Sequence, residues 1–123
     1  MKKLLALLLV VQISGCAVWE AYTTAPYDTN EYALINKIRT SAELDGCDPV
    51  TIDSLYANSL ELKNFSQYLP HNDKTIAMND NLFKVVEELH NKQNPSAVYC
   101  KAKLNIIAKS AEAIQQVTGT RHR

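Results

Sequence analysis

Residues 97–119, AVYCKAKLNIIAKSAEAIQQVTG, decide the fold, because small and apolar side chains recur there at alternating steps of three and four residues. This spacing places them along one narrow seam of a helix, as in coiled coils. We expect the helix to begin at Asn94-Pro95, where asparagine can cap and proline fits the first turn, and to end at Gly119. Neighbouring helices must cover a seam of this kind. Its residues are Ala97, Cys100, Leu104, Ile107, Ala111, Ile114 and Thr118.

An earlier segment is predicted to form a helix over Thr29–Asp45. Asp28 and Glu31 have the spacing of a capping box, in which Asp28 accepts from first-turn amides and Glu31 bonds back. Gly46 is a natural terminating residue because glycine can adopt a positive φ. The segment between carries an apolar stripe at helical spacing. The stripe consists of Leu34, Ile35, Ile38 and Ala42.

Two more helices are predicted between these segments. Asp48-Pro49 starts one, with aspartate as the cap, and Pro70 closes it. Asn72 and Asp73 are expected to cap the other. Four amphipathic segments joined by short breaks predict an all-α, up-down four-helix bundle over residues 28–119. The apolar stripes are Ile52, Leu55, Ser59, Leu62 and Leu69 in one helix and Met78, Leu82, Val85, Val86 and Leu89 in the next.

The first sixteen residues, MKKLLALLLVVQISGC, have a different character. Two lysines precede the apolar run Leu4–Val11, which is too short to span about 30 Å of hydrocarbon and has the size of a secretory signal core. The run ends in Ile13-Ser14-Gly15-Cys16, which resembles the lipobox of bacterial membrane lipoproteins. The resemblance implies a cleaved signal peptide over residues 1–15, and a diacylglyceryl group and an acylated amine on Cys16. Ala17, where such lipoproteins often carry aspartate for inner-membrane retention, implies the outer membrane.

The remaining chain is long enough for one domain only. We expect a lipidated tether over residues 16–27, the bundle over 28–119 and a basic tail over 120–123. The chain has 13 basic and 13 acidic residues, and removing Lys2 and Lys3 leaves a formal charge of −2. Such a balance gives no indication of a nucleic-acid partner.

Cys47 and Cys100 remain after Cys16 is lipidated. In an exported chain an even pair is most simply a disulfide. In an up-down bundle the end of the first helix and the start of the fourth lie together, which places both cysteines at one end. That end is expected to point away from the bilayer, and the turn around Pro70 to face it.

Several side chains near the predicted membrane side are candidates for contact with it. Trp19 and Tyr22 lie in the tether, where amphipathic rings can rest at the headgroup level, although a disordered Trp19 is an equal alternative. Arg121 and Arg123 are candidates for contact with anionic headgroups, with a frayed terminus as the alternative.

Histidines raise the question of metal or acid–base chemistry. His90 falls at the same end as Cys47 and Cys100, but the spacing matches no compact zinc pattern and a disulfide accounts for both thiols. His71 with Asp73 has the form of a base and its orienting residue, yet no nucleophile stands nearby. We predict no metal site and no cofactor besides the covalent lipid.

Glu87 and Glu88 are adjacent carboxylates, but neighbours on a helix point in different directions. Without a nucleophile elbow, a phosphate loop or a metal motif, no catalytic residue is predicted. The expected function is that of a lipid-anchored envelope protein that binds or structurally supports an envelope partner. Phage- or plasmid-type exclusion, lysis or enzyme inhibition are roles of this kind. The alternative is a small envelope hydrolase that acts on cell-wall or lipid material.

Overall fold

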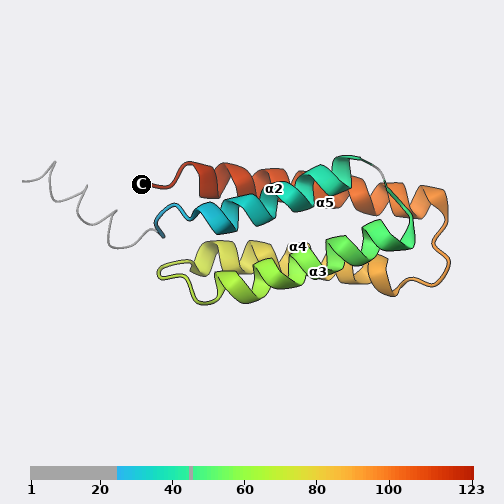
Figure 1. Cartoon of the computed structure of the whole chain (residues 1–123), viewed down its shortest axis with the longest axis horizontal. Coiled ribbons are helices and arrows are strands. Elements are labelled where there is room, and N and C mark those ends of the chain that lie inside the picture. The colour runs from blue at the N-terminus through green and yellow to red at the C-terminus, as the bar shows by residue number, and fades with distance from the viewer. Residues whose placement is uncertain (1–24, 45) are drawn as a thin grey trace, which may run out of the picture.

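The computed structural model describes residues 25–44 and 46–123 as four helices. They are α2 (Thr29–Glu43), α3 (Pro49–Ser66), α4 (Asp73–Asn91) and α5 (Ala97–Gly119). The chain runs up and down through them (Figure 1), and each helix packs against the next while α2 also packs against α5. This ring confirms the predicted up-down bundle. The predicted signal peptide (1–15), Cys16, Trp19 and Tyr22 lie outside the described residues.

The beginnings of α2 and α3 follow from their predicted caps. The Asp28 carboxylate accepts a hydrogen bond from the Glu31 N–H at 2.9 Å, and the Asp48 carboxylate accepts one from the Thr51 N–H at 3.0 Å. Pro49 occupies the first turn of α3, where its missing N–H leaves no bond unmade. Both N-terminal caps are therefore confirmed.

Two predicted caps and two predicted helix ends are corrected. Helix α2 ends at Glu43 rather than at Asp45, and Gly46 does not have a positive φ. Ser96, not Asn94-Pro95, caps α5, because its hydroxyl directly precedes the helix and accepts from the Tyr99 N–H at 3.1 Å. The Asn72 side chain makes no cap bond for α4, because it is engaged elsewhere. Helix α3 ends at Ser66 rather than at Pro70, and residues 67–71 form the turn that leads to α4.

The core of the bundle is built from the predicted stripes. On α5 the seam residues Cys100, Leu104, Ile107, Ala111 and Ile114 are at most 1% exposed, whereas Ala97 at its start is exposed. They pack with side chains from the other three helices. Burying such side chains supplies the main favourable free energy of folding. The chief partners are Ile35, Ile38, Leu55, Leu62, Leu82, Val86 and Leu89.

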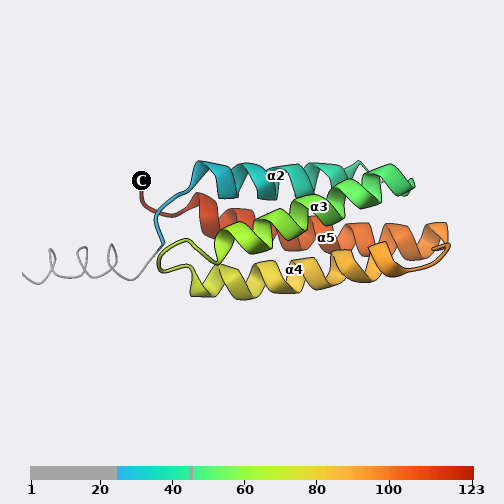
Figure 2. The same cartoon turned by 60° about the horizontal axis from the view of Figure 1, so that its bottom comes forward.

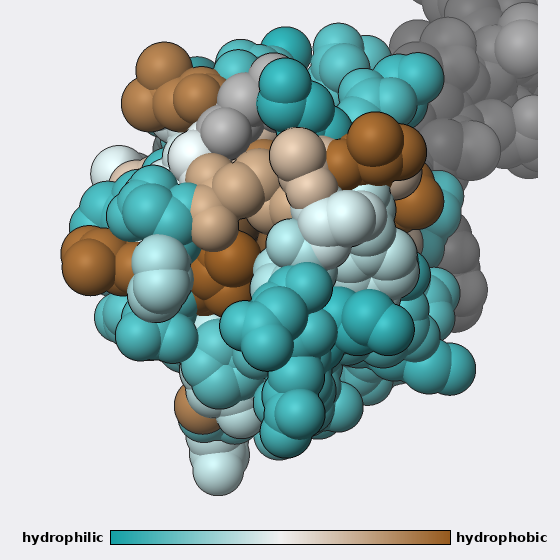
Figure 3. Space-filling view, turned by 90° about the vertical axis from the view of Figure 1, so that its right-hand side faces the viewer, coloured by the Kyte–Doolittle hydropathy of each residue, from teal (hydrophilic) through white to brown (hydrophobic). Residues whose placement is uncertain are grey.

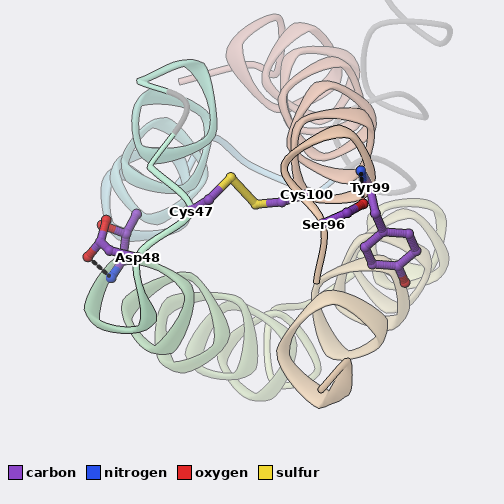
Figure 4. The surroundings of a disulfide bond; sticks show 6 residues. Cys47, Asp48, Ser96, Tyr99 and Cys100 are labelled. Atoms are coloured by element: carbon purple, nitrogen blue, oxygen red, sulfur yellow. Dashed lines mark hydrogen bonds between the residues drawn. A yellow bond between two sulfur atoms is a disulfide. The ribbon is translucent and has the colours of Figure 1, made fainter. Parts of the chain in front are cut away.

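A disulfide joins Cys47 to Cys100, as predicted. The two sulfur atoms are 2.11 Å apart and the Cα atoms 6.2 Å apart, within the usual range. Figure 4 shows the bond linking the α2–α3 loop to the first turn of α5. The described chain begins and ends at the opposite end of the bundle (Figure 2), so the disulfide lies far from the point where the tether would attach.

His71, in the turn between α3 and α4, has a left-handed backbone with φ of 56°. Because this conformation crowds the Cβ atom of most residues, we expect His71→Gly to raise the free energy of unfolding by about 0.5 to 1 kcal/mol. Asn94→Gly, at φ of 47°, is the matched comparison. It should raise the free energy of unfolding by less, because asparagine tolerates the left-handed region. Urea denaturation measures both changes. A loss of stability in His71→Gly would contradict the expectation.

Candidate functional site

The bundle end opposite the disulfide holds a buried ion pair between the first turn of α2 and the C-terminus. The Nη1 atom of Arg121 lies 2.7 Å from Oε1 of Glu31. The Arg121 side chain is 4% exposed and the Glu31 side chain 0%. Charges buried so completely need partners for their remaining polar atoms.

Asn72 and Thr75 supply those partners. Nη2 of Arg121 donates to Asn72 Oδ1 at 2.5 Å and to Thr75 Oγ1 at 2.7 Å. The Asn72 amide donates to Glu31 Oε2 at 3.0 Å and to the Ser66 carbonyl at 3.0 Å. We call Glu31, Asn72, Thr75 and Arg121 the polar clasp. It ties the start of α2 and the chain end to the α3–α4 turn.

The electrostatics of the clasp indicate a structural role. Burial raises the pKa of Glu31, while the charge of Arg121 and the hydrogen bond from Asn72 act in the opposite direction. Both Glu31 oxygens are occupied by protein donors and the side chain is closed to solvent. A carboxyl group held in this way has no access to a substrate.

The clasp corrects three predictions. Arg121 is not a membrane-surface contact, because its guanidinium is buried against Glu31. The frayed terminus, given as the alternative for residues 120–123, is wrong: the Tyr27 N–H donates to the His122 carbonyl at 2.9 Å, and the Arg123 guanidinium lies 4.7 Å from the Tyr27 ring centroid. The Glu31 carboxylate bonds Arg121 and Asn72 rather than completing the capping box.

His90, predicted to lie near the disulfide end, is occupied by contacts of its own. Its Nε2 atom is 3.1 Å from Asp53 Oδ1 and its Nδ1 atom 3.3 Å from Asn91 Oδ1, while the ring stacks on Tyr56 at 4.2 Å between centroids. These contacts and the stacking hold the imidazole ring against α3. Across residues 25–44 and 46–123, no group of three or more metal-ligating side chains gathers.

His71 lies far from the other catalytic candidates, Glu87, Glu88 and His90, which stand together near the end of α4. His71 precedes the first residue of α4 and His90 lies in its last turn, so the helix separates them by about 28 Å. Glu88 accepts a hydrogen bond from the Lys103 ammonium at 2.6 Å, which lowers the pKa of its carboxyl and keeps it ionised. Glu87 is half-buried on the same helix. His71 therefore does not share a site with the three candidates on α4.

The disulfide end carries three exposed apolar side chains, which sequence reasoning did not single out. Leu44 is 77% exposed, Val50 78% and Val98 81%. They project from the end of α2 and from the first turns of α3 and α5. Figure 3 faces this end and shows apolar groups set among hydrophilic ones. We call Leu44, Val50 and Val98 the apolar tip.

Local bonds hold the backbone at the tip. The disulfide links the loop after Leu44 to α5, and the Thr51 hydroxyl donates to Asp48 at 2.7 Å. A Cβ atom on Gly46 would lie 2.9 Å from Thr51 Cγ2, so a larger residue there would force the Thr51 side chain or the loop to shift. Three exposed apolar side chains at one end of the bundle make that end the candidate binding surface. The signal in the sequence was large apolar residues outside the helical stripes.

In the part of the chain that the structure describes, no helix is long and apolar enough to cross a membrane. No protein-family model matches the chain, and neither a curated protein nor a solved structure matches it.

Proposed function

We propose that this protein is a lipid-anchored binding module of the bacterial envelope, held by acyl chains on Cys16 and presenting the apolar tip to a partner protein. The observation that carries the proposal is the exposure of Leu44, Val50 and Val98 on one end of the bundle. Three exposed apolar side chains lower solubility. A partner that covers them would gain the free energy of burying apolar surface.

The geometry of the bundle supports this orientation. Cys16 precedes Ala25 by nine residues, and Ala25 lies at the clasp end. Helix α5 contains 23 residues and is therefore about 34 Å long. The lipid would thus hold the clasp end close to the outer membrane and place the tip some 30 Å or more farther away.

Lipidation is tested by Cys16→Ser. This change should abolish metabolic labelling with a tagged fatty acid and release the protein from membranes, because the acyl chains supply the membrane affinity. Wild-type protein labelled in parallel is the control, and its distribution between inner and outer membrane tests the Ala17 rule. Labelling that persists in Cys16→Ser would refute the lipid anchor.

The tip is tested by photo-crosslinking in intact cells. A crosslinking amino acid at Val50 or Val98 should give an adduct of one defined mass, and one at Ile106, which is 45% exposed on the side of α5, should not. The Leu44→Ser and Val98→Ser changes together should remove the adduct formed from position 50. They should alter the free energy of unfolding by no more than about 0.5 kcal/mol each, as surface substitutions usually do.

The hydrolase alternative predicts a different pattern. It requires loss of the biological phenotype on substitution of His71, His90, Glu87 or Glu88, with the fold intact. The binding module predicts instead that the phenotype is lost when Leu44, Val50 or Val98 of the apolar tip is substituted. An equal adduct from Ile106, or a phenotype unchanged by the tip substitutions, would count against the proposed module.

A further inference from the structure

A hollow of about 330 Å³ lies between α2 and α3 on the outside of the bundle. Leu34 and Phe65 are half-buried in it and Ala33 is exposed, so its floor is largely apolar. A shallower apolar surface continues from it along α3, past Leu60 and Ala57. The hollow is lined by Asn30, Ala33, Leu34, Lys37, Glu61 and Phe65.

We propose that the tether segment of residues 18–22 folds back onto this hollow and places the Trp19 indole over Leu34 and Phe65. This inference deepens the proposed function: it rests on the lipid anchor only for its consequence, which is that a folded-back tether would shorten the distance between the acyl chains and the clasp end.

The tether is long enough to reach the hollow from the point where it joins the bundle. The described chain begins at Ala25, which is 3% exposed and lies at the end where α2 starts. Trp19 precedes Ala25 by six residues, enough to reach about 20 Å. Leu34 is the sixth residue of α2, about 8 Å along the helix from its start. The segment is therefore long enough to reach the hollow with slack.

The side chains of residues 18–22 match the apolar floor of the hollow. Residues 18–22 read Val-Trp-Glu-Ala-Tyr, so apolar and aromatic side chains accompany a single carboxylate. Lys37 and Glu61 both stand at the rim of the hollow, and neither makes an ion pair within the described residues, so we expect Glu20 to approach Lys37 and to avoid Glu61. An indole buries a large area with few rotatable bonds, which suits an apolar hollow with a charged rim.

Trp19 is the only tryptophan in the chain and so reports on its own surroundings. The four helices and the disulfide lie within residues 25–123, so the mature chain from residue 16, carrying Cys16→Ser, retains the fold. In dilute, lipid-free solution its tryptophan emission should be blue-shifted relative to the urea-unfolded chain. Quenching by acrylamide should be several-fold weaker than in urea.

The Ala33→Glu change should move the emission to the value of the unfolded chain, because it fills the hollow with a side chain that repels Glu20. Ala77→Glu is the matched control, since Ala77 is an exposed alanine on α4, and it should leave the emission unchanged. Circular dichroism and the melting temperature verify that both variants fold.

Three results would overturn the inference. One is solvent-like emission of the wild-type chain, and another is a blue shift that appears only with phosphatidylglycerol-containing vesicles, which would place Trp19 at the headgroups. The third is a shift that depends on protein concentration, which would indicate a second copy. Failure of fatty-acid labelling at Cys16 would refute the anchor and leave this fluorescence result standing, so the two failures are distinguishable.

Discussion

Reducing the Cys47–Cys100 bond should lower the free energy of unfolding by about 2 to 5 kcal/mol. The bond closes a loop between residues separated by 53 positions. In the chain-entropy model a loop of that length gives roughly 4 kcal/mol, because the cross-link removes conformations from the unfolded chain. A domain of this size has a total stability of only about 5 to 15 kcal/mol, so the reduced protein should be marginal.

The experiment compares thermal unfolding with and without a reductant. Each kcal/mol lost should lower the melting temperature by about 4 to 8 °C in a domain of this size. A variant with both cysteines changed to alanine is the control, and its melting temperature should not respond to the reductant. Two reactive thiols per chain in the unreduced wild-type protein, besides any at Cys16, would contradict the bond.

Arg121→Met should be the most destabilising single change at the other end of the bundle, with a loss of about 3 to 5 kcal/mol. The change leaves the buried Glu31 carboxylate without its counter-charge and removes hydrogen bonds to Asn72 and Thr75. Arg123→Met is the matched control, because Arg123 is exposed two residues away. It loses only the contact with the Tyr27 ring and should alter stability by no more than about 1 kcal/mol in urea denaturation.

The loss in Arg121→Met should depend on pH. Burial raises the pKa of Glu31 above its ordinary 4.5, so the folded state binds the proton of this carboxyl more tightly than the unfolded chain does. The resulting stabilisation is complete below the unfolded pKa and is lost as the pH rises through the folded pKa. Without Arg121 the pKa of Glu31 rises further, so the deficit should widen as the pH rises from the folded pKa of the wild-type carboxyl toward that of the variant. A deficit that is constant over this range would contradict the assigned pairing.

The helices and the disulfide could be predicted from sequence because their signals are periodic or local. Steps of three and four residues identify the seam from Cys100 to Ile114, and a cap such as Asp48 needs only its own first turn. The disulfide followed from the even pair of cysteines in a chain expected to be exported, and the helix order placed both cysteines at one end of the bundle. These features need no knowledge of how side chains meet across the bundle.

The clasp escaped prediction because its partners are distant in the chain. Glu31 and Arg121 are 90 positions apart, and each has a plausible local role, as a cap or as a surface cation. One signal was present: Glu31 extends the stripe of Ile35, Ile38 and Ala42 by one turn, so a carboxylate stood where a core residue belongs. A charge in such a position predicts a buried counter-charge, although not which one.

Helices α2 and α5 are joined at both ends, by a covalent bond at one and by the clasp at the other. If the lipid holds residue 16 and a partner pulls on the tip, the tension enters through α2. The disulfide would transmit part of that tension to α5. The ion pair between Arg121 and Glu31 connects α5 back to α2 at the clasp end. Because the two helices are connected at both ends, they would share the tension. Lengthening one helix alone would require the ion pair or the disulfide to break. Reduction of the disulfide would leave α2 to bear the force alone.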